Sequence, residues 1–156
     1  LLKLEKTDAA LEKINIYLKN NPNSELINEL ASDTYAKLED YSKANEYIEK
    51  AIKTNPFKSE YYSDKTYFAY KLYDDSELEE KSKFLEIFNQ NLNKIKDLNN
   101  QKESAINYYQ LAYHYWLNDD IKPFIKSLEK SLELGLNSSH SLSRAFNFLI
   151  DFIINI

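Results

Sequence analysis

The chain has no cysteine, one glycine, three prolines and two histidines among its 156 residues. Without cysteine it forms no disulfide, no thiolate zinc site and no cysteine nucleophile, and the compartment stays open between the cytoplasm and the periplasm. A single glycine leaves no glycine-rich loop that would bind phosphate. So little glycine and proline also disfavours a protein of many short strands, and favours long helices.

The charge of the chain excludes two classes of partner. Lys and Arg number 20 and Asp and Glu 25, which gives a net charge of −5 with both signs scattered. Nucleic acids and anionic membranes both require a basic face, so the sequence argues against either as the main partner. It also contains no run of about 18 or more apolar residues that would span a membrane.

Candidate catalytic and metal-binding groups are few. His114 and His140 lie in different predicted elements, and neither has a second histidine or a carboxylate at ligand spacing. We therefore expect no metal and no cofactor, and we interpret His114 as a packing residue or one at the edge of a binding surface. Adjacent acids such as Asp119 and Asp120 fall at predicted turns, where helix capping explains them better than acid–base catalysis. The sequence predicts no enzymatic activity.

The first third of the sequence repeats with a period of about 34 residues. Shifting the chain by this period aligns Leu4 with Leu38, Glu5 with Glu39, Ala10 with Ala44, Glu12 with Glu46, Ile14 with Ile48, Lys19 with Lys53, and Asn21-Pro22 with Asn55-Pro56. Ala44 and Ala51 are small residues seven apart in a predicted helix, which indicates that this helix approaches its neighbours closely. Asn55-Pro56 ends the helix, because the residue before proline avoids helical geometry.

This pattern resembles the tetratricopeptide repeat, whose unit is two antiparallel helices and whose units stack into a right-handed superhelix. Residues 25–58 match it best: Ala31, Ser32, Tyr35, Ala44, Ile48, Ala51 and Pro56. Asn28 departs from the pattern, which usually has a large aromatic residue there. The resemblance implies an all-α, right-handed α-solenoid of antiparallel helix pairs with about eight helices.

A second match covers residues 105–138, with Phe124 in place of a small residue. The interval from position 25 to 59 equals the period, whereas the interval from 59 to 105 is longer, so the middle unit carries 12 extra residues. We assign them to one over-long helix at residues 76–98. The resemblance then divides a single domain into a trailing half-repeat (1–24), a repeat (25–58), a repeat with a lengthened second helix (59–104), a repeat (105–138) and a closing helix (139–156).

In this family the first helix of each unit lines a concave face, so the resemblance implies a partner-binding groove. The positions that would face this groove hold two acidic residues and then five aromatic ones: Glu29, Asp33, Tyr67, Tyr70, Tyr109, Tyr113 and Trp116. Family members that grip a C-terminal carboxylate use Lys, Asn and Arg there, so we do not expect that specificity. We expect a non-catalytic scaffold that binds an amphipathic helix or extended peptide of another protein, with a basic flank facing the acids. The same rings also suit packing against one another.

The alternative interpretation is structural. The last stretch, SLSRAFNFLIDFIINI, ends in residues that are apolar nearly all round, whereas a terminal solenoid helix normally has a polar outer side. We therefore expect residues 139–156 to be covered by further chain, by a second copy or by a partner. In this interpretation the protein is an oligomerisation module that forms a homodimer through its C-terminal helix.

Overall fold

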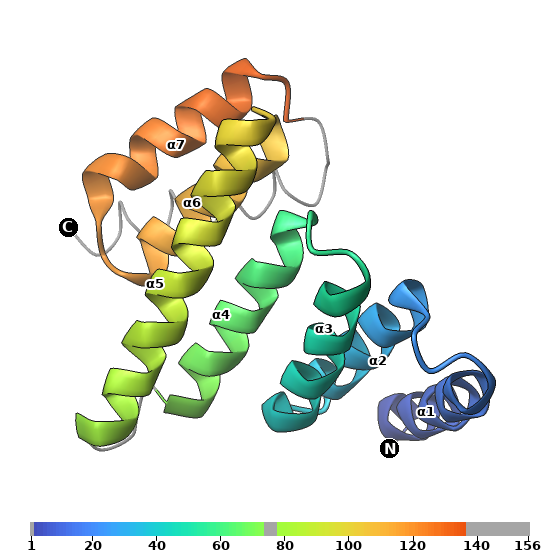
Figure 1. Ribbon diagram of the computed structural model, residues 1–156. Helices are drawn as coiled ribbons and strands as arrows, with labels where there is room; N and C mark the ends of the chain where they lie inside the picture. The colour runs from blue at the N-terminus through green and yellow to red at the C-terminus, as the bar shows by residue number, and fades with distance from the viewer. Residues whose placement is uncertain (1, 74–77, 137–156) are drawn as a thin grey trace. The chain divides into compact units, whose positions relative to one another are not determined.

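The computed structural model of the protein describes residues 2–73 and 78–136 (Figure 1). These residues form seven helices and no strand: α1 (Leu2–Asn20), α2 (Glu25–Lys37), α3 (Tyr41–Thr54), α4 (Ser59–Tyr73), α5 (Leu78–Gln101), α6 (Ala105–Leu117) and α7 (Ile121–Glu133). The prediction of an all-α fold is confirmed. The closing helix predicted for residues 139–156 lies outside the described residues.

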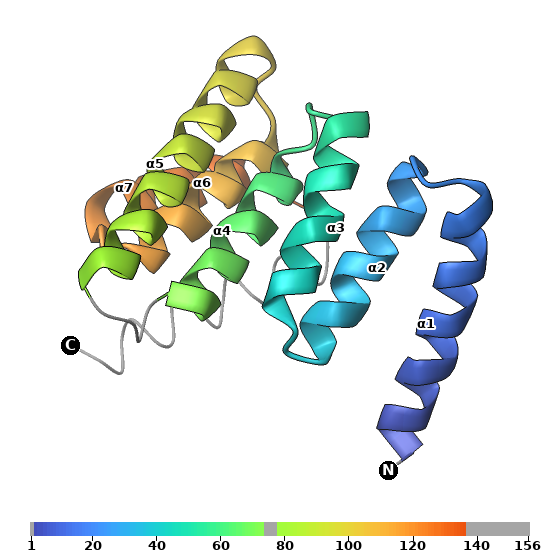
Figure 2. The same ribbon diagram turned by 60° about the horizontal axis from the view of Figure 1, so that its bottom comes forward.

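The chain divides into two compact units, Leu1–Asn91 and Leu92–Ile156. In the first unit α1 packs on α2, α2 on α3, and α3 on α4, so that consecutive helices lie side by side (Figure 2). In the second unit α6 and α7 pack against each other as a pair. Helix α5 contributes its first part to one unit and its last part to the other. It has 24 residues, whereas α3 has 14 and α7 has 13.

The turn inside a helix pair has the same backbone geometry in both units. Glu39, between α2 and α3, has a φ of 62°, and Asp119, between α6 and α7, has a φ of 53°. Around each of them the hydrogen bonds repeat: the Asp40 N–H donates to the Tyr35 carbonyl at 3.0 Å, and the Asp120 N–H to the Tyr115 carbonyl at 2.9 Å. The two turns therefore occupy equivalent places in their helix pairs.

Side-chain caps fix where several helices begin. The Ser24 hydroxyl accepts a hydrogen bond from the Ile27 N–H, and Ser104 accepts one from the Asn107 N–H. Asp40 does the same for the Lys43 N–H at the start of α3. Each cap satisfies a backbone donor that has no partner within its own helix.

The core of the first unit depends on small residues in α3. Ala44 and Ala51 are fully buried beside Ile48, and the Tyr61 and Phe68 rings of α4 complete the cluster. The Ser32 hydroxyl of α2 donates to the Ala44 carbonyl at 2.9 Å, a contact that a bulky side chain at this interface would prevent. The close approach predicted from the two alanines is confirmed.

The second unit builds its core from different residues. Phe124 and Leu128 of α7 pack with Tyr109 and Ala112 of α6 and with Leu136. Phe124 stands where the first unit has Ala44, and the small Ala112 stands where the first unit has Ser32. The Ser131 hydroxyl donates to the Ala105 carbonyl at 2.6 Å, which ties α7 to the start of α6.

Asn28, the departure from the repeat pattern, has a structural role. Its side chain is fully buried, and its Nδ2 donates to the carbonyls of Pro22 at 3.0 Å and Ser24 at 2.8 Å. Its Oδ1 has no hydrogen-bond partner among the described residues. The asparagine therefore holds the turn before α2, at the place where an aromatic ring would have filled space.

We expect Glu39→Gly to leave the free energy of unfolding unchanged or to raise it by up to about 1 kcal/mol, because glycine adopts a positive φ without steric cost. Glu46→Gly is the matched control, since Glu46 is exposed in the middle of α3 and glycine there costs about 1 kcal/mol. Urea unfolding of both variants measures the difference. An equal loss in the two variants would show that the Glu39 backbone is not strained.

Candidate partner-binding site

In the first unit, two of the predicted aromatic residues lie on α4 and are partly buried. The Tyr67 ring meets the Tyr41 ring edge-on at 6.0 Å between centroids and lies 6.1 Å from the Phe68 ring. The Tyr70 ring meets the Phe84 ring of α5 edge-on at 5.9 Å. Each ring is therefore positioned by other rings of the same unit and still reaches the surface in part.

Lys71 lies beside both of these rings. Its Nζ is 5.6 Å from the Tyr67 centroid and 5.9 Å from the Tyr70 centroid, within the range of cation–π attraction. The residue is exposed at the end of α4. The α4 surface thus combines two tyrosine rings with one positive charge, and we call Tyr67, Tyr70 and Lys71 the α4 surface.

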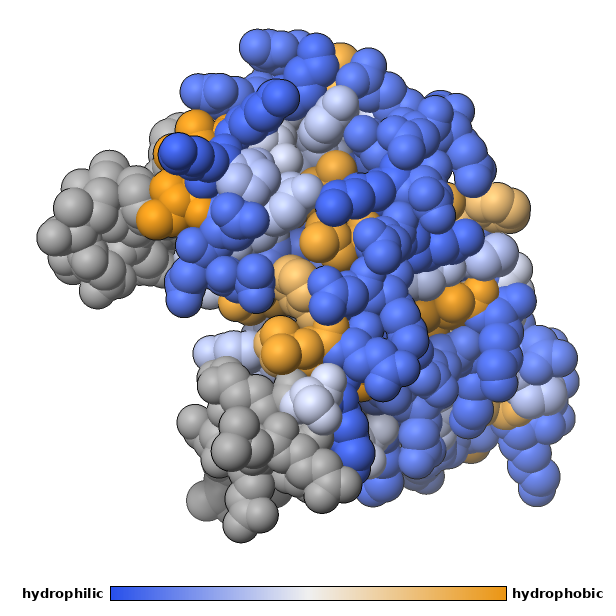
Figure 3. All heavy atoms as spheres, turned by 60° about the vertical axis from the view of Figure 1, so that its left-hand side comes forward, coloured by the Kyte–Doolittle hydropathy of each residue, from blue (hydrophilic) through white to orange (hydrophobic). Residues whose placement is uncertain are grey.

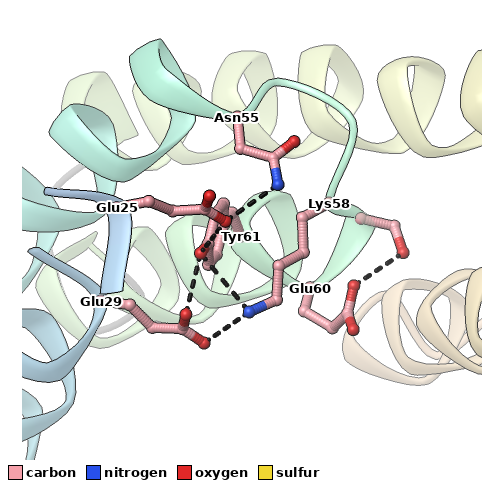
Figure 4. A network of polar contacts seen from close by, with 7 residues as sticks. Glu25, Glu29, Asn55, Lys58, Glu60 and Tyr61 are labelled. Atoms are coloured by element: carbon pink, nitrogen blue, oxygen red, sulfur yellow. Dashed lines mark hydrogen bonds and ion pairs between the residues drawn. The ribbon is translucent and has the colours of Figure 1, made fainter. Parts of the chain in front are cut away.

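Glu29, one of the two predicted groove acids, belongs to a polar network (Figure 4). Its Oε1 lies 2.7 Å from the Lys58 Nζ, and the Tyr61 hydroxyl lies 2.8 Å from its Oε2. The same hydroxyl lies 2.8 Å from Glu25 Oε1, to which the Asn55 Nδ2 donates at 2.9 Å. Because a hydroxyl carries one proton, Tyr61 donates a hydrogen bond to one carboxylate at a time. Lys58 and Asn55 supply the other donors.

The network changes the acidity of its members. The Asn55 amide, followed by the Tyr61 hydroxyl, holds the pKa of Glu25 below its usual value. Burial, and then the two glutamates, raise the pKa of Tyr61. Tyr61 stays protonated and Glu25 ionised, so the network is a stable set of charge-assisted hydrogen bonds between α2 and the start of α4.

The network also changes the role expected for Glu29. Its negative charge is matched by Lys58 within the first unit, and the other predicted groove acid, Asp33, is exposed on α2. Sequence reasoning missed this pairing. The available signal was Glu25 and Glu29, one turn apart on α2, preceding Lys58 and Tyr61 by about one repeat.

In the second unit the predicted residues separate into two groups. Tyr113 and Trp116 are partly buried on α6, and their rings stack at 6.0 Å with an interplanar angle of 26°. Tyr109 is only 4% exposed and belongs to the core cluster with Phe124 and Leu128. Its ring fills the space between α6 and α7, so the structure places Tyr109 in the core instead of on a partner-facing surface.

His114 is a packing residue of the second unit. It is fully buried, and its Nδ1 lies 3.0 Å from the Gln110 carbonyl, to which a protonated Nδ1 donates. Burial lowers the pKa of His114 to about 4, although the hydrogen bond to Gln110 acts in the opposite direction. The histidine is therefore neutral at physiological pH.

The exposed apolar side chains of the described residues are scattered. The most exposed are Leu26 on α2 and Phe57 in the loop before α4, at 69% and 70%. Figure 3 shows a face on which hydrophilic residues dominate and hydrophobic residues form small groups.

Within residues 2–73 and 78–136 there is no group of three or more His, Asp or Glu side chains that would hold a metal. None of the helices described for this chain is long and apolar enough to cross a membrane.

Comparisons with known proteins agree on the architecture. Residues 26–58 match the family model of the tetratricopeptide repeat. The solved structures include TTC0263, a thermophilic TPR protein of Thermus thermophilus, which is 23% identical, with a TM-score of 0.72 over 97% of this chain and 77% of that one. MamA of MSR-1 is 15% identical, with a TM-score of 0.54 over 88% of this chain and 72% of that one. A comparison with curated proteins gives no sequence match.

The MamA RS-1 ArsTM double mutant is a further similar structure, 17% identical, with a TM-score of 0.56 over 89% of this chain and 71% of that one. At such identities the likeness concerns the fold alone. The chain thus contains a match to the tetratricopeptide repeat at residues 26–58 and shares the helical-repeat fold of solved TPR structures such as TTC0263.

We expect Tyr61→Phe to lower the free energy of unfolding by about 1–3 kcal/mol, because it removes a buried donor shared by two carboxylates. Tyr108→Phe is the matched control, since the Tyr108 hydroxyl donates to Glu103 at 2.8 Å in an exposed pair. Denaturant unfolding followed by circular dichroism measures both. Equal losses in the two variants would contradict a stabilising role for the network.

We expect acid to destabilise the second unit through His114. The unfolded chain binds a proton near pH 6.5 and the folded chain only near pH 4, so stability falls as the pH decreases between these values. From about pH 7 to about pH 5 the loss is roughly 2 kcal/mol.

Urea unfolding of the wild type and of His114→Gln at both pH values tests this effect. We expect the variant to be less stable at both pH values. Its free energy of unfolding should, however, lack the part of the pH dependence that comes from His114. His140→Gln, which leaves His114 as the only histidine, isolates that contribution. If the free energy of unfolding of His114→Gln changes with pH as much as that of the wild type, the pH dependence comes from groups other than His114.

Proposed function

We propose that the protein is a non-catalytic scaffold that binds an amphipathic helix or an extended apolar segment of a partner protein on the first helices of its repeats. The observation that carries this proposal is the state of the aromatic rings at those positions. Tyr67 and Tyr70 of α4 are held by neighbouring rings and remain partly exposed. Tyr113 and Trp116 of α6 stack on each other and are also partly exposed.

Such rings suit the recognition of an apolar segment. A tyrosine or tryptophan offers a large contact area with few rotatable bonds, and a ring already packed on one side loses little further freedom on binding. Aromatic anchors of this type carry much of the binding energy in protein interfaces. Tyr109, which is in the core, and Glu29, which is paired with Lys58, are not part of the proposed contact surface. Asp33 remains a candidate on α2.

The alternative, self-association through residues 139–156, stays a prediction. These residues lie outside the described part of the chain, and none of the described contacts bears on it.

A selection with a phage-displayed library of random peptides tests the proposed function. We expect the chain to enrich peptides with apolar residues at helical spacing, and Tyr67→Ala with Tyr70→Ala to weaken the peptides that bind α4 at least tenfold, because two anchors of the same helix are lost. Tyr17→Ala is the matched control, since Tyr17 is 60% exposed on α1. Anisotropy titrations measure the affinities, and circular dichroism checks that each variant is folded.

A failure to enrich any peptide would overturn the proposal. So would selected peptides that bind the folded double variant as tightly as the wild type.

A further inference from the structure

The α4 surface contains a lysine, Lys71, that makes no ion pair with the residues that the structure describes. Lys58 pairs with Glu29 at 2.7 Å, and Lys65 pairs with Glu49 at 2.9 Å. Lys71 makes no ion pair with any residue in the described ranges; its contacts there are the Tyr67 and Tyr70 rings. An ammonium group near a ring face keeps N–H donors directed away from the ring, available to an acceptor.

The two tyrosine rings beside Lys71 are held in place by other aromatic rings. Tyr41 and Phe68 position the Tyr67 ring, and Phe84 positions the Tyr70 ring. The two rings in turn restrict the lysine side chain, which otherwise has several freely rotating bonds. A charge that is already restricted loses less entropy when it binds a partner, so the arrangement favours recognition over a freely moving surface lysine.

The preceding repeat presents the same feature. Lys37 precedes Lys71 by one repeat length, lies in the last turn of α2 and is exposed. It too makes no ion pair within the described part of the chain. A lysine in the last turn also interacts favourably with its helix dipole, which explains its position. The dipole does not explain why the Lys71 ammonium lies over two tyrosine rings.

The two glutamates of the network at the start of α4 do not favour a basic ligand. Glu29 and Glu25 already accept hydrogen bonds from Lys58, Tyr61 and Asn55. A basic partner residue would have to displace these donors, whereas an acidic residue would meet Lys71 without displacing any described contact.

We propose that the α4 surface binds a carboxylate of the partner: an Asp or Glu side chain within an apolar segment, with the carboxylate on Lys71 and the apolar residues on Tyr67 and Tyr70. This rests on the proposed function and specifies its ligand. A segment with a single acid fits better than a polyacidic tail. Asp64 lies on α4 two turns before Lys71, about 10 Å along the helix, and the chain has a net charge of −5.

The test repeats the peptide selection on the wild type, on Lys71→Glu and on Lys50→Glu. Lys50 is the matched control, because it is also exposed and its Nζ also lies over a tyrosine ring, that of Tyr47 at 4.4 Å, but on α3. We expect peptides selected by the wild type and by Lys50→Glu to contain Asp or Glu at a fixed distance from their apolar residues. Lys71→Glu is expected to select Lys or Arg at that place.

A double-mutant cycle then measures the contact itself. The selected acidic peptide and its Glu→Gln or Asp→Asn form are titrated against the wild type and Lys71→Gln. The peptide change should weaken binding to the wild type about twofold to fivefold, as one exposed ion pair does, and should have no effect on Lys71→Gln. The difference should shrink at high salt, since exposed charges are screened.

The outcomes separate the two proposals. If peptides are selected without any acidic preference, or with the same acidic preference on Lys71→Glu, the carboxylate assignment is overturned and the proposed function stands. If no peptide is selected by any of the three proteins, the proposed function fails and the carboxylate assignment fails with it.

Discussion

The structure depends on the close approach of the two helices within a repeat, and that approach requires small side chains between them. In the first unit Ala31, Ser32, Ala44 and Ala51 are fully buried, and the Ser32 hydroxyl reaches the Ala44 carbonyl. Beside these small residues, the large Tyr61 and Phe68 rings of α4 pack against α3. Tyr67 packs against the edge of the same cluster and Tyr70 against the Phe84 ring, so the packed core holds both rings in place.

The second unit satisfies the same constraint with a large side chain on its second helix and a small one on the helix that faces it. Phe124 replaces the small residue of α3, Ala112 is small on the facing helix, and Ser131 is fully buried where the first unit has Ala51. The turn between its helices keeps the left-handed residue, Asp119 here and Glu39 in the first unit. The backbone of the helix pair is thus maintained while its core differs. This also explains Tyr109: beside Phe124 and Leu128 its ring has a place in the core, which the equivalent Glu29 lacks.

Most helices were predictable from the sequence because their causes are local, although the lengthened helix, predicted to end at 98, ends at Gln101. The repeat period, the Asn55-Pro56 stop and the small residues of α3 each act within a short distance of the feature they determine. The polar network was not predictable in this way. Glu25 and Glu29 meet Asn55, Lys58 and Tyr61 across 29 to 36 residues, and the contact depends on side-chain conformations that the repeat pattern leaves undetermined. The same limit explains why Glu29 was interpreted as an open groove acid.

Ion pairs within the first unit engage several of its lysines. The chain is acidic overall, with a net charge of −5, so its long-range field attracts basic partners. At short range Lys43, Lys58 and Lys65 are engaged by Asp40, Glu29 and Glu49, whereas Lys71 remains beside its two tyrosines. Screening in physiological salt acts over about 8 Å, so the charges within that distance of a surface position contribute more to its local field than the charges beyond it. The charge that a surface of this unit presents at short range is therefore set by its own side chains, and the net charge of the chain does not predict it.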